Sequence, residues 1–198
     1  WYTKAAELGN ADAMNLVGDM YYSGEGVEQD YDTAFDWYTK AAELGNADAM
    51  LNLGYLYDWG YGVEEDLSKA FDWYTKSAEL GNTIAMCNLG IMYEYGRGVE
   101  RDYGKAIELY KKAIDLGDTD AMCDLGNLYY SGSGTQQSFD AAINWYKKAA
   151  ELENTTAMHY LGYMYRFGEG VEQDYDAAVD WYTKAAELGN ADAMNLVG

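Results

Sequence analysis

The amino-acid sequence repeats itself every 36 residues from one end to the other, with no insertion or deletion in the register. Pairs of glycines two residues apart keep this step, as Gly60/Gly62 and Gly96/Gly98 show. The same step separates Trp1, Trp37, Trp73, Trp145 and Trp181, with Leu109 in the one remaining place. A fixed period of this length is typical of stacked supersecondary units, so we expect an array of about five and a half units rather than a closed globule.

One repeat, residues 46–81, predicts two helices joined by a tight turn. The first half places small and apolar residues on one helical face, namely Ala47, Met50, Leu53, Gly54 and Tyr57. This helix should end near Trp59, because Gly60 and Gly62 take positive φ angles at little cost and allow a sharp reversal. The second helix should start at Asp66 and stop before Gly81. Its apolar side is expected at Ala70, Trp73, Tyr74, Ser77, Ala78 and Leu80.

Residues that favour helix N-caps precede both helices of each repeat, and their side chains can accept hydrogen bonds from the first turn. Before the first helix they are Asn10, Asn46, Asn82, Asp118, Asn154 and Asn190, and the units begin near these residues. Before the second helix they are Asp30, Asp66, Asp102, Ser138 and Asp174. Asn154 also opens the tripeptide Asn-Thr-Thr, a glycosylation acceptor, so capping and glycosylation both remain open for it.

Small residues and lysines recur at fixed positions of the repeat. We expect the small residues to let neighbouring helices approach closely, at Ala34, Ala70, Ala106, Ala142 and Ala178 and at Gly18, Gly54, Gly90, Gly126, Gly162 and Gly198. The lysines lie toward the C-terminal end of the second helix, where a positive charge suits the helix dipole. They are Lys40, Lys76, Lys112, Lys148 and Lys184.

The fourth unit departs most from the pattern. Thr135 stands in the place of valine, Ser138 in the place of aspartate, and Glu153 in the place of the glycine that follows the second helix. We expect Asn154 to take the left-handed conformation that glycine would otherwise supply there. The stretch 132–155 should therefore be locally the weakest part of the array.

These recurring residues resemble the Sel-one-like repeat (SLR) family, a group of all-helical repeats related to the tetratricopeptide repeats. The family pattern stands here as Ala49, Leu53-Gly54, Tyr57, Gly60-x-Gly62-Val63-x-x-Asp66, Lys69-Ala70, Trp73-Tyr74-x-Lys76, Ala78 and Gly81. The resemblance covers the whole chain and implies an all-α, right-handed α-solenoid of helix-turn-helix units. It implies less about function, because repeats of this kind serve as scaffolds in many settings.

The resemblance also implies that the first helix of each repeat lines a concave face. By analogy with tetratricopeptide domains, its second, fifth, ninth, twelfth and thirteenth residues should face the groove. The candidate interaction surface is Asp48, Leu51, Tyr55, Asp58, Trp59, Ile91, Glu94, Tyr95, Asn127, Tyr130, Tyr163, Arg166 and Phe167. Such a groove is aromatic and mildly acidic, and it suits an extended peptide with basic or amide groups, or a glycan that stacks on the rings. Packing of these aromatic residues between repeats remains the alternative.

Cys87, Cys123 and His159 occupy one register in three successive units, which raises the question of a metal site. Packed helices lie roughly 8–10 Å apart, whereas zinc needs its ligands at about 2.0–2.3 Å, so these residues should not share one ion. The same spacing disfavours a disulfide, whose Cα atoms must lie within about 7 Å. His159, the only histidine, has no nucleophile or acid placed beside it by the sequence pattern. We expect no metal, no cofactor and no catalytic residue, and hence no enzyme.

The net charge of −21, from 34 acidic and 13 basic residues, limits the classes of partner that the chain can bind. Nucleic acids and anionic membrane surfaces are disfavoured because they require lysine and arginine. Basic proteins or peptides remain compatible with this charge. No apolar run approaches the roughly 18 residues of a membrane-spanning helix, so we expect no membrane insertion.

Residues 1–18 and 181–198 are identical, five full periods apart. The chain also begins inside a second helix and stops inside a first helix, so we expect 1–198 to be a single array and a window of a longer one. Matched ends could associate head to tail into a filament. The sequence therefore predicts a non-catalytic scaffold that self-assembles, or forms part of a very long array, to make a fibre. The alternative is an adaptor that binds an extended peptide or protein partner in the concave groove. The compartment is left open, although a fibre-forming chain would be extracellular or at the cell surface.

Overall fold

The computed structural model describes residues 2–197, which form helices joined by turns and loops and contain no strand. Trp1 and Gly198, the first tryptophan of the series and the last of the recurring small residues, lie outside this range. Each complete repeat holds two helices of twelve or thirteen residues, as the period predicted. The all-α class is therefore confirmed.

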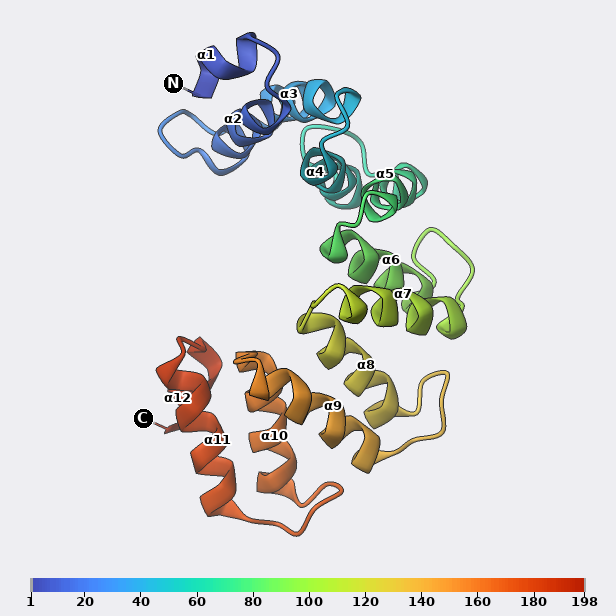
Figure 1. The fold of residues 1–198 in the computed structure, drawn as a ribbon, viewed down its shortest axis with the longest axis vertical. Coiled ribbons are helices and arrows are strands. Elements are labelled where there is room, and N and C mark those ends of the chain that lie inside the picture. Colours follow the sequence, from blue (N-terminus) through green and yellow to red (C-terminus); the bar gives the residue numbers. More distant parts are fainter. Residues whose placement is uncertain (1, 198) are drawn as a thin grey trace. The chain divides into compact units, whose positions relative to one another are not determined.

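The helices group into two compact units, Trp1–Asp102 and Tyr103–Gly198. The first contains α1 (Tyr2–Glu7), α2 (Ala11–Ser23), α3 (Tyr31–Glu43), α4 (Ala47–Trp59), α5 (Leu67–Glu79) and α6 (Thr83–Tyr95). The second contains α7 (Tyr103–Asp115), α8 (Asp120–Ser131), α9 (Phe139–Glu151), α10 (Thr155–Phe167), α11 (Tyr175–Glu187) and α12 (Ala191–Val197). Within each unit a helix packs against the helices before and after it in the chain, so that helical hairpins stack as in an α-solenoid (Figure 1).

At ten positions, side chains that were expected to cap the helices accept a hydrogen bond from the first turn. Asn46 Oδ1, for example, accepts a hydrogen bond of 2.7 Å from the Ala49 backbone N–H at the start of α4. Equivalent bonds begin other first helices at Asn10, Asn82, Asp118, Asn154 and Asn190, and second helices at Asp30, Asp66, Ser138 and Asp174. Asn154 is buried and its amide is fully engaged, which favours capping over glycosylation at this residue.

The capping asparagines also tie one repeat to the next. While Oδ1 accepts from its own helix, Nδ2 donates to an aspartate in the first turn of the preceding first helix. The pairs are Asn46 to Asp12, Asn82 to Asp48 and Asn154 to Asp120, at 2.8, 2.8 and 2.7 Å. Among the residues that favour N-caps, only asparagine carries its acceptor and its donor on separate atoms, so that one side chain can make both bonds. At one further cap, Asp118 replaces asparagine. The residue 34 positions earlier is Ile84, whose side chain has no hydrogen-bond acceptor, so an amide donor would have no partner at that residue.

In four repeats, a tyrosine from the second helix fills the core beside a glycine of the first helix. Tyr74 is fully buried, and a Cβ added to Gly54 would lie 2.4 Å from its Cδ1 and Cε1 atoms. The same contact joins Gly18 to Tyr38, Gly126 to Tyr146 and Gly162 to Tyr182. These glycines therefore set how closely the paired helices approach, as the sequence predicted for the small residues.

Two residues of the second helix, Leu80 and Trp73, differ from the expected pattern. Leu80 was expected on the apolar side, but it is the C-cap residue of α5 and is 55% exposed, because its side chain leaves the packed face where the helix ends. Trp73 is half-buried, and Lys76 Nζ lies 3.9 Å from the centre of its ring. The recurring lysines thus cover tryptophans in addition to suiting the helix dipole. Similar pairs are Lys40 with Trp37, Lys148 with Trp145 and Lys184 with Trp181.

The prediction for the end of α9 was wrong. Asn154 has an ordinary φ of −69°, and Glu153 itself takes a positive φ of 61°. Asn154 must keep extended backbone angles to cap α10, so the reversal falls on the residue before it, where the other repeats carry glycine. A side chain in this conformation costs about 1–2 kcal/mol.

Replacing Glu153 by glycine should therefore raise the free energy of unfolding by about 0.5–1 kcal/mol, because the relieved strain exceeds the added entropy of glycine in the unfolded chain. Gly81 is the matched control, since it occupies the same repeat position with a φ of 91° and no atom within 4 Å of an added Cβ. Gly81→Glu should lower stability by about 1 kcal/mol. Urea unfolding followed by circular dichroism measures both changes, and effects of the same sign would contradict this interpretation.

Candidate functional site

The structure places the predicted groove residues at three levels of exposure. Exposed residues are Asp48, Trp59, Tyr95, Tyr163, Arg166 and Phe167, while Tyr55, Ile91, Glu94, Asn127 and Tyr130 are half-buried. Trp59, Tyr95 and Phe167 are 57%, 67% and 51% exposed, so about half or more of each residue is accessible to a partner. Leu51 and Asp58 are buried and present little surface. The set is divided between the two units.

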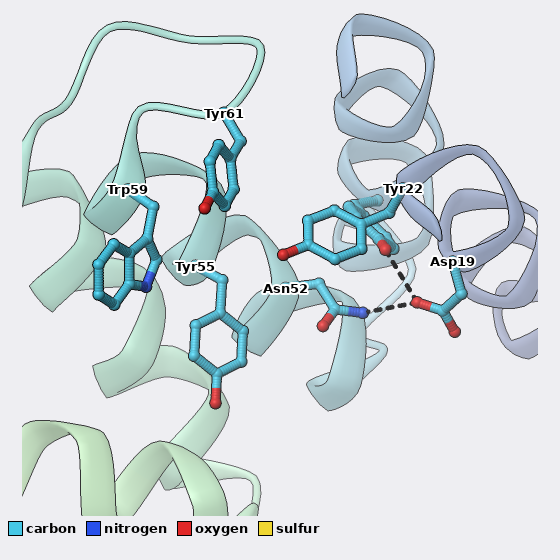
Figure 2. A pocket seen from close by; sticks show the side chains of 7 residues that line it. Asp19, Tyr22, Asn52, Tyr55, Trp59 and Tyr61 are labelled. Atoms are coloured by element: carbon cyan, nitrogen blue, oxygen red, sulfur yellow. Dashed lines mark hydrogen bonds between the residues drawn. The ribbon is translucent and has the colours of Figure 1, made fainter. Parts of the chain in front are cut away.

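Part of the set in the first unit surrounds a cavity of about 480 Å³, which we call the first cavity. Its lining residues are Asp19, Tyr22, Tyr38, Asn52, Tyr55, Trp59 and Tyr61. Figure 2 shows the side chains of Tyr55, Trp59 and Tyr61 on one side of Asn52, and those of Tyr22 and Asp19 on the other. The cavity is therefore composite: α2 and α3 supply one wall, and α4 with the loop after it supplies the other.

Asp19 is the one carboxylate of this cavity. Its Oδ1 accepts hydrogen bonds from Tyr38 Oη at 2.9 Å and from Asn52 Nδ2 at 3.1 Å, and its Oδ2 accepts from Asn15 Nδ2 at 3.2 Å. Burial raises the pKa of the Asp19 carboxyl above its ordinary value and outweighs the opposing effect of the Tyr38 hydrogen bond. Burial likewise raises the pKa of Tyr38. The carboxylate is therefore held in place and partly desolvated.

A second cavity, of about 280 Å³, lies in the second unit. It is lined by Asn127, Tyr130, Tyr146, His159, Tyr160, Tyr163 and Met164. Asn127, Tyr130 and Tyr146 follow Asp19, Tyr22 and Tyr38 by three full periods, and Tyr160 and Tyr163 follow Asn52 and Tyr55 by the same step. Asn127 Oδ1 accepts from Tyr146 Oη at 2.7 Å, as Asp19 does from Tyr38. The two cavities are thus two copies of one site, formed at the same positions of the repeat.

An ion pair occupies a neighbouring position in the first unit. Arg97 Nη2 lies 2.9 Å from Asp58 Oδ1, and Tyr74 Oη donates to Asp58 Oδ2 at 3.3 Å. Burial raises the pKa of the Asp58 carboxyl, while the charge of Arg97 opposes the rise. Asp58 is 7% exposed, so this predicted groove residue acts within the protein.

The loop residue between the paired glycines contacts the first helix of the preceding repeat, which the sequence pattern did not predict. Arg97 reaches Asp58, 39 residues earlier, and at the same spacing Glu169 accepts a hydrogen bond from the Tyr130 hydroxyl. Tyr61 lies against Tyr22 with ring centres 6.2 Å apart. The loop of one repeat therefore completes the wall begun by the preceding repeat. Complementary residue types 39 positions apart, such as Asp58 and Arg97, are the signal that could have revealed this contact.

The cysteines and the histidine form no site together. Cys87 and Cys123 are buried thiols, and burial raises the pKa of Cys123 to about 12, which leaves it protonated and unreactive at neutral pH. His159 lines the second cavity and packs against the rings of Tyr160 and Tyr182. Across residues 2–197, no group of three histidine, cysteine, aspartate or glutamate side chains is arranged to hold a metal ion. None of the described helices is long and apolar enough to cross a membrane.

Comparison with known families gives the repeat its name. The Sel1 repeat matches residues 1–10, 11–46, 47–82, 83–118, 119–154 and 155–190. The chain belongs to the Sel1 repeat family. No curated protein matches the chain closely enough to be counted as a relative.

Solved structures of Sel1 repeat proteins share the fold. A Sel1 repeat protein from Oxalobacter formigenes is 36% identical over 94% of this chain and 76% of its own, with a TM-score of 0.85. The protective antigen c5321 of uropathogenic Escherichia coli strains is 37% identical over the whole chain, with a TM-score of 0.75, and this chain spans 42% of its length. The immunity protein Pa5087 from Pseudomonas aeruginosa is 26% identical over 92% of this chain and 67% of its own, with a TM-score of 0.67. The family resemblance and the solenoid fold are thereby confirmed.

Proposed function

We propose that this Sel1 repeat chain is a non-catalytic adaptor that holds an extended segment of a partner protein against the first helices of a single array. The observation that carries the proposal is that the same cavity recurs three repeats along the sequence. An exposed aromatic residue stands at the same repeat position each time, Trp59 in the first unit and Phe167 in the second. Each cavity, taken within its own unit, suits a side chain that projects from an extended peptide. Large aromatic residues are also the side chains that most often dominate the binding energy of interfaces.

Selection from a phage-displayed library of random peptides of about twelve residues tests this proposal. The enriched peptides, made synthetically, should bind the wild-type chain and lose at least tenfold in affinity for Trp59→Ser, by isothermal titration calorimetry. Leu44→Ser is the matched control, because Leu44 lies in the same unit, is also 57% exposed and lines neither cavity. Absence of enriched peptides, or equal losses in both variants, would reject the adaptor function.

Head-to-tail self-assembly into a fibre is the second candidate, and the identity of residues 1–18 with 181–198 favours it. Electron microscopy of the purified chain over a range of concentrations tests it. Ordered filaments whose axial repeat equals a whole number of 36-residue units would support a polymer, and Trp59→Ser should leave them intact. Discrete particles at every concentration would exclude it.

A further inference from the structure

Among the residues that the structure describes, no cation balances the carboxylate of Asp19. No lysine or arginine side chain in the part of the chain that the structure describes lies within ion-pair distance of it. Its hydrogen-bond donors, Tyr38, Asn52 and Asn15, are all neutral. A partly buried and uncompensated charge is costly to the fold, and such charges concentrate at functional sites.

Aromatic rings line the space around this carboxylate. Tyr22, Tyr55, Trp59 and Tyr61 all border the first cavity (Figure 2). Tyr61 is held in place by stacking on Tyr31, with ring centres 5.0 Å apart and an angle of 13° between the planes. Ring faces carry negative electrostatic potential and attract ammonium and guanidinium groups, most strongly when water is excluded. The volume of about 480 Å³ lies within the range of small-ligand pockets, roughly 300–1,000 Å³.

The protein already places a guanidinium on one of these rings. The central carbon of Arg97 lies 5.8 Å from the centre of the Trp59 ring, and the charge of Arg97 is balanced by Asp58. Trp59 is still 57% exposed, so much of the ring remains available. The net charge of −21 would also draw a basic segment toward the chain.

The second cavity supplies an internal comparison. Asn127 stands in the place of Asp19 and accepts a hydrogen bond from the equivalent tyrosine, Tyr146, so this hydrogen bond is kept while the charge is lost. None of the residues that line this cavity carries a carboxylate. Glu169 lies outside the lining and accepts the hydroxyl of Tyr130.

We infer that the first cavity is a receptor for a cationic side chain, arginine or lysine, of the extended partner segment, with Asp19 as counter-ion and the four rings as its cage. The second cavity, with an amide in the same place, takes an uncharged side chain. This inference rests on the proposed adaptor function and names the chemistry of the side chain that the first cavity binds.

Two probes of nearly equal shape and different charge test the inference: Nα-acetyl-arginine amide and Nα-acetyl-citrulline amide. In titrations followed by NMR at the Trp59 indole N–H, the arginine probe should bind wild type at least tenfold more tightly than the citrulline probe. Asp19→Asn should abolish this difference by weakening arginine alone. The fold should survive, because Asn127 shows that an asparagine can accept the tyrosine hydroxyl at this position.

A reciprocal variant covers the case in which Asp19→Asn unfolds. Asn127→Asp should give the second cavity a preference for the arginine probe, read at the ring signals of His159, the only histidine. Equal binding of both probes to wild type and to Asn127→Asp would overturn the cation receptor. Peptides that bind in a Trp59-dependent manner but lack basic residues would also reject it while leaving the adaptor function standing, so the two failures are distinguishable.

Discussion

Gly54→Ala should destabilise the first unit by about 3 kcal/mol, at the upper end of the range for overpacked cores. The added methyl group would lie 2.4 Å from two ring carbons of Tyr74, which is itself fully buried and cannot swing away. The paired helices α4 and α5 would have to separate, and contacts along the whole hairpin would weaken. Urea unfolding of the purified variant, followed by circular dichroism, measures the change.

A double variant shows whether the loss arises from this contact. Tyr74→Leu alone should be destabilising because it leaves a cavity. In the Gly54→Ala/Tyr74→Leu protein the two losses should be clearly less than additive, since the methyl group then occupies vacated space. Repeat arrays are stabilised by nearest-neighbour contacts, so hydrogen exchange in α10 should change little. A Gly54→Ala variant within 0.5 kcal/mol of wild type would contradict the argument.

Arg97→Met should cost about 2 kcal/mol at pH 7, because it leaves the carboxylate of Asp58 buried without its counter-ion. The expected loss is below that of a fully buried pair, since the Arg97 side chain is 36% exposed. Methionine keeps much of the length of arginine and limits the loss of packing. Chemical unfolding at pH 7 gives the difference from wild type.

The cost of Arg97→Met should also depend on pH. Burial raises the pKa of Asp58 in the folded protein, and Arg97 works against that rise. Without Arg97 the folded-state pKa moves further above the unfolded value, so the folded state binds a proton more readily than the unfolded state. The penalty is therefore full above the folded pKa, and the gap to wild type should narrow as the pH falls through it. Asp58→Asn/Arg97→Met is the control and should lack this narrowing, while an unchanged gap between pH 7 and pH 4 would contradict the explanation.

Much of the fold follows from the sequence because the same physical cues recur in every repeat. Asn46 and Asp66 mark the two helix starts, and Gly60 and Gly81 mark the ends, at residues that the structure confirms within one or two positions. Each cue is local, so it can be interpreted without knowing the tertiary contacts. Glu153 shows the limit, since whether it or Asn154 takes the left-handed conformation depends on which residue the next helix needs as its cap.

The candidate site was less predictable because its walls come from different repeats. The analogy with tetratricopeptide domains places Tyr55 and Trp59 on the expected side, and both line the first cavity. It does not show that Tyr61, in a loop, closes that cavity against Tyr22 of the preceding repeat. Asp58 shares the expected helical face, but Arg97 and Tyr74 draw it into the protein.

The loop residue between the paired glycines has an evolutionary consequence. It belongs by sequence to one repeat and by contact to the one before, as Arg97 and Asp58 show. In-register recombination that inserts or removes a repeat therefore pairs an old helix with a new loop at the junction. Such an event creates a cavity with a new set of lining residues without any point mutation. Core contacts such as that between Gly54 and Tyr74 are internal to one repeat and are therefore unchanged. In this architecture, gene rearrangement can diversify recognition and keep the core of each repeat, while its cost to stability falls on contacts across the junction such as Asp58–Arg97.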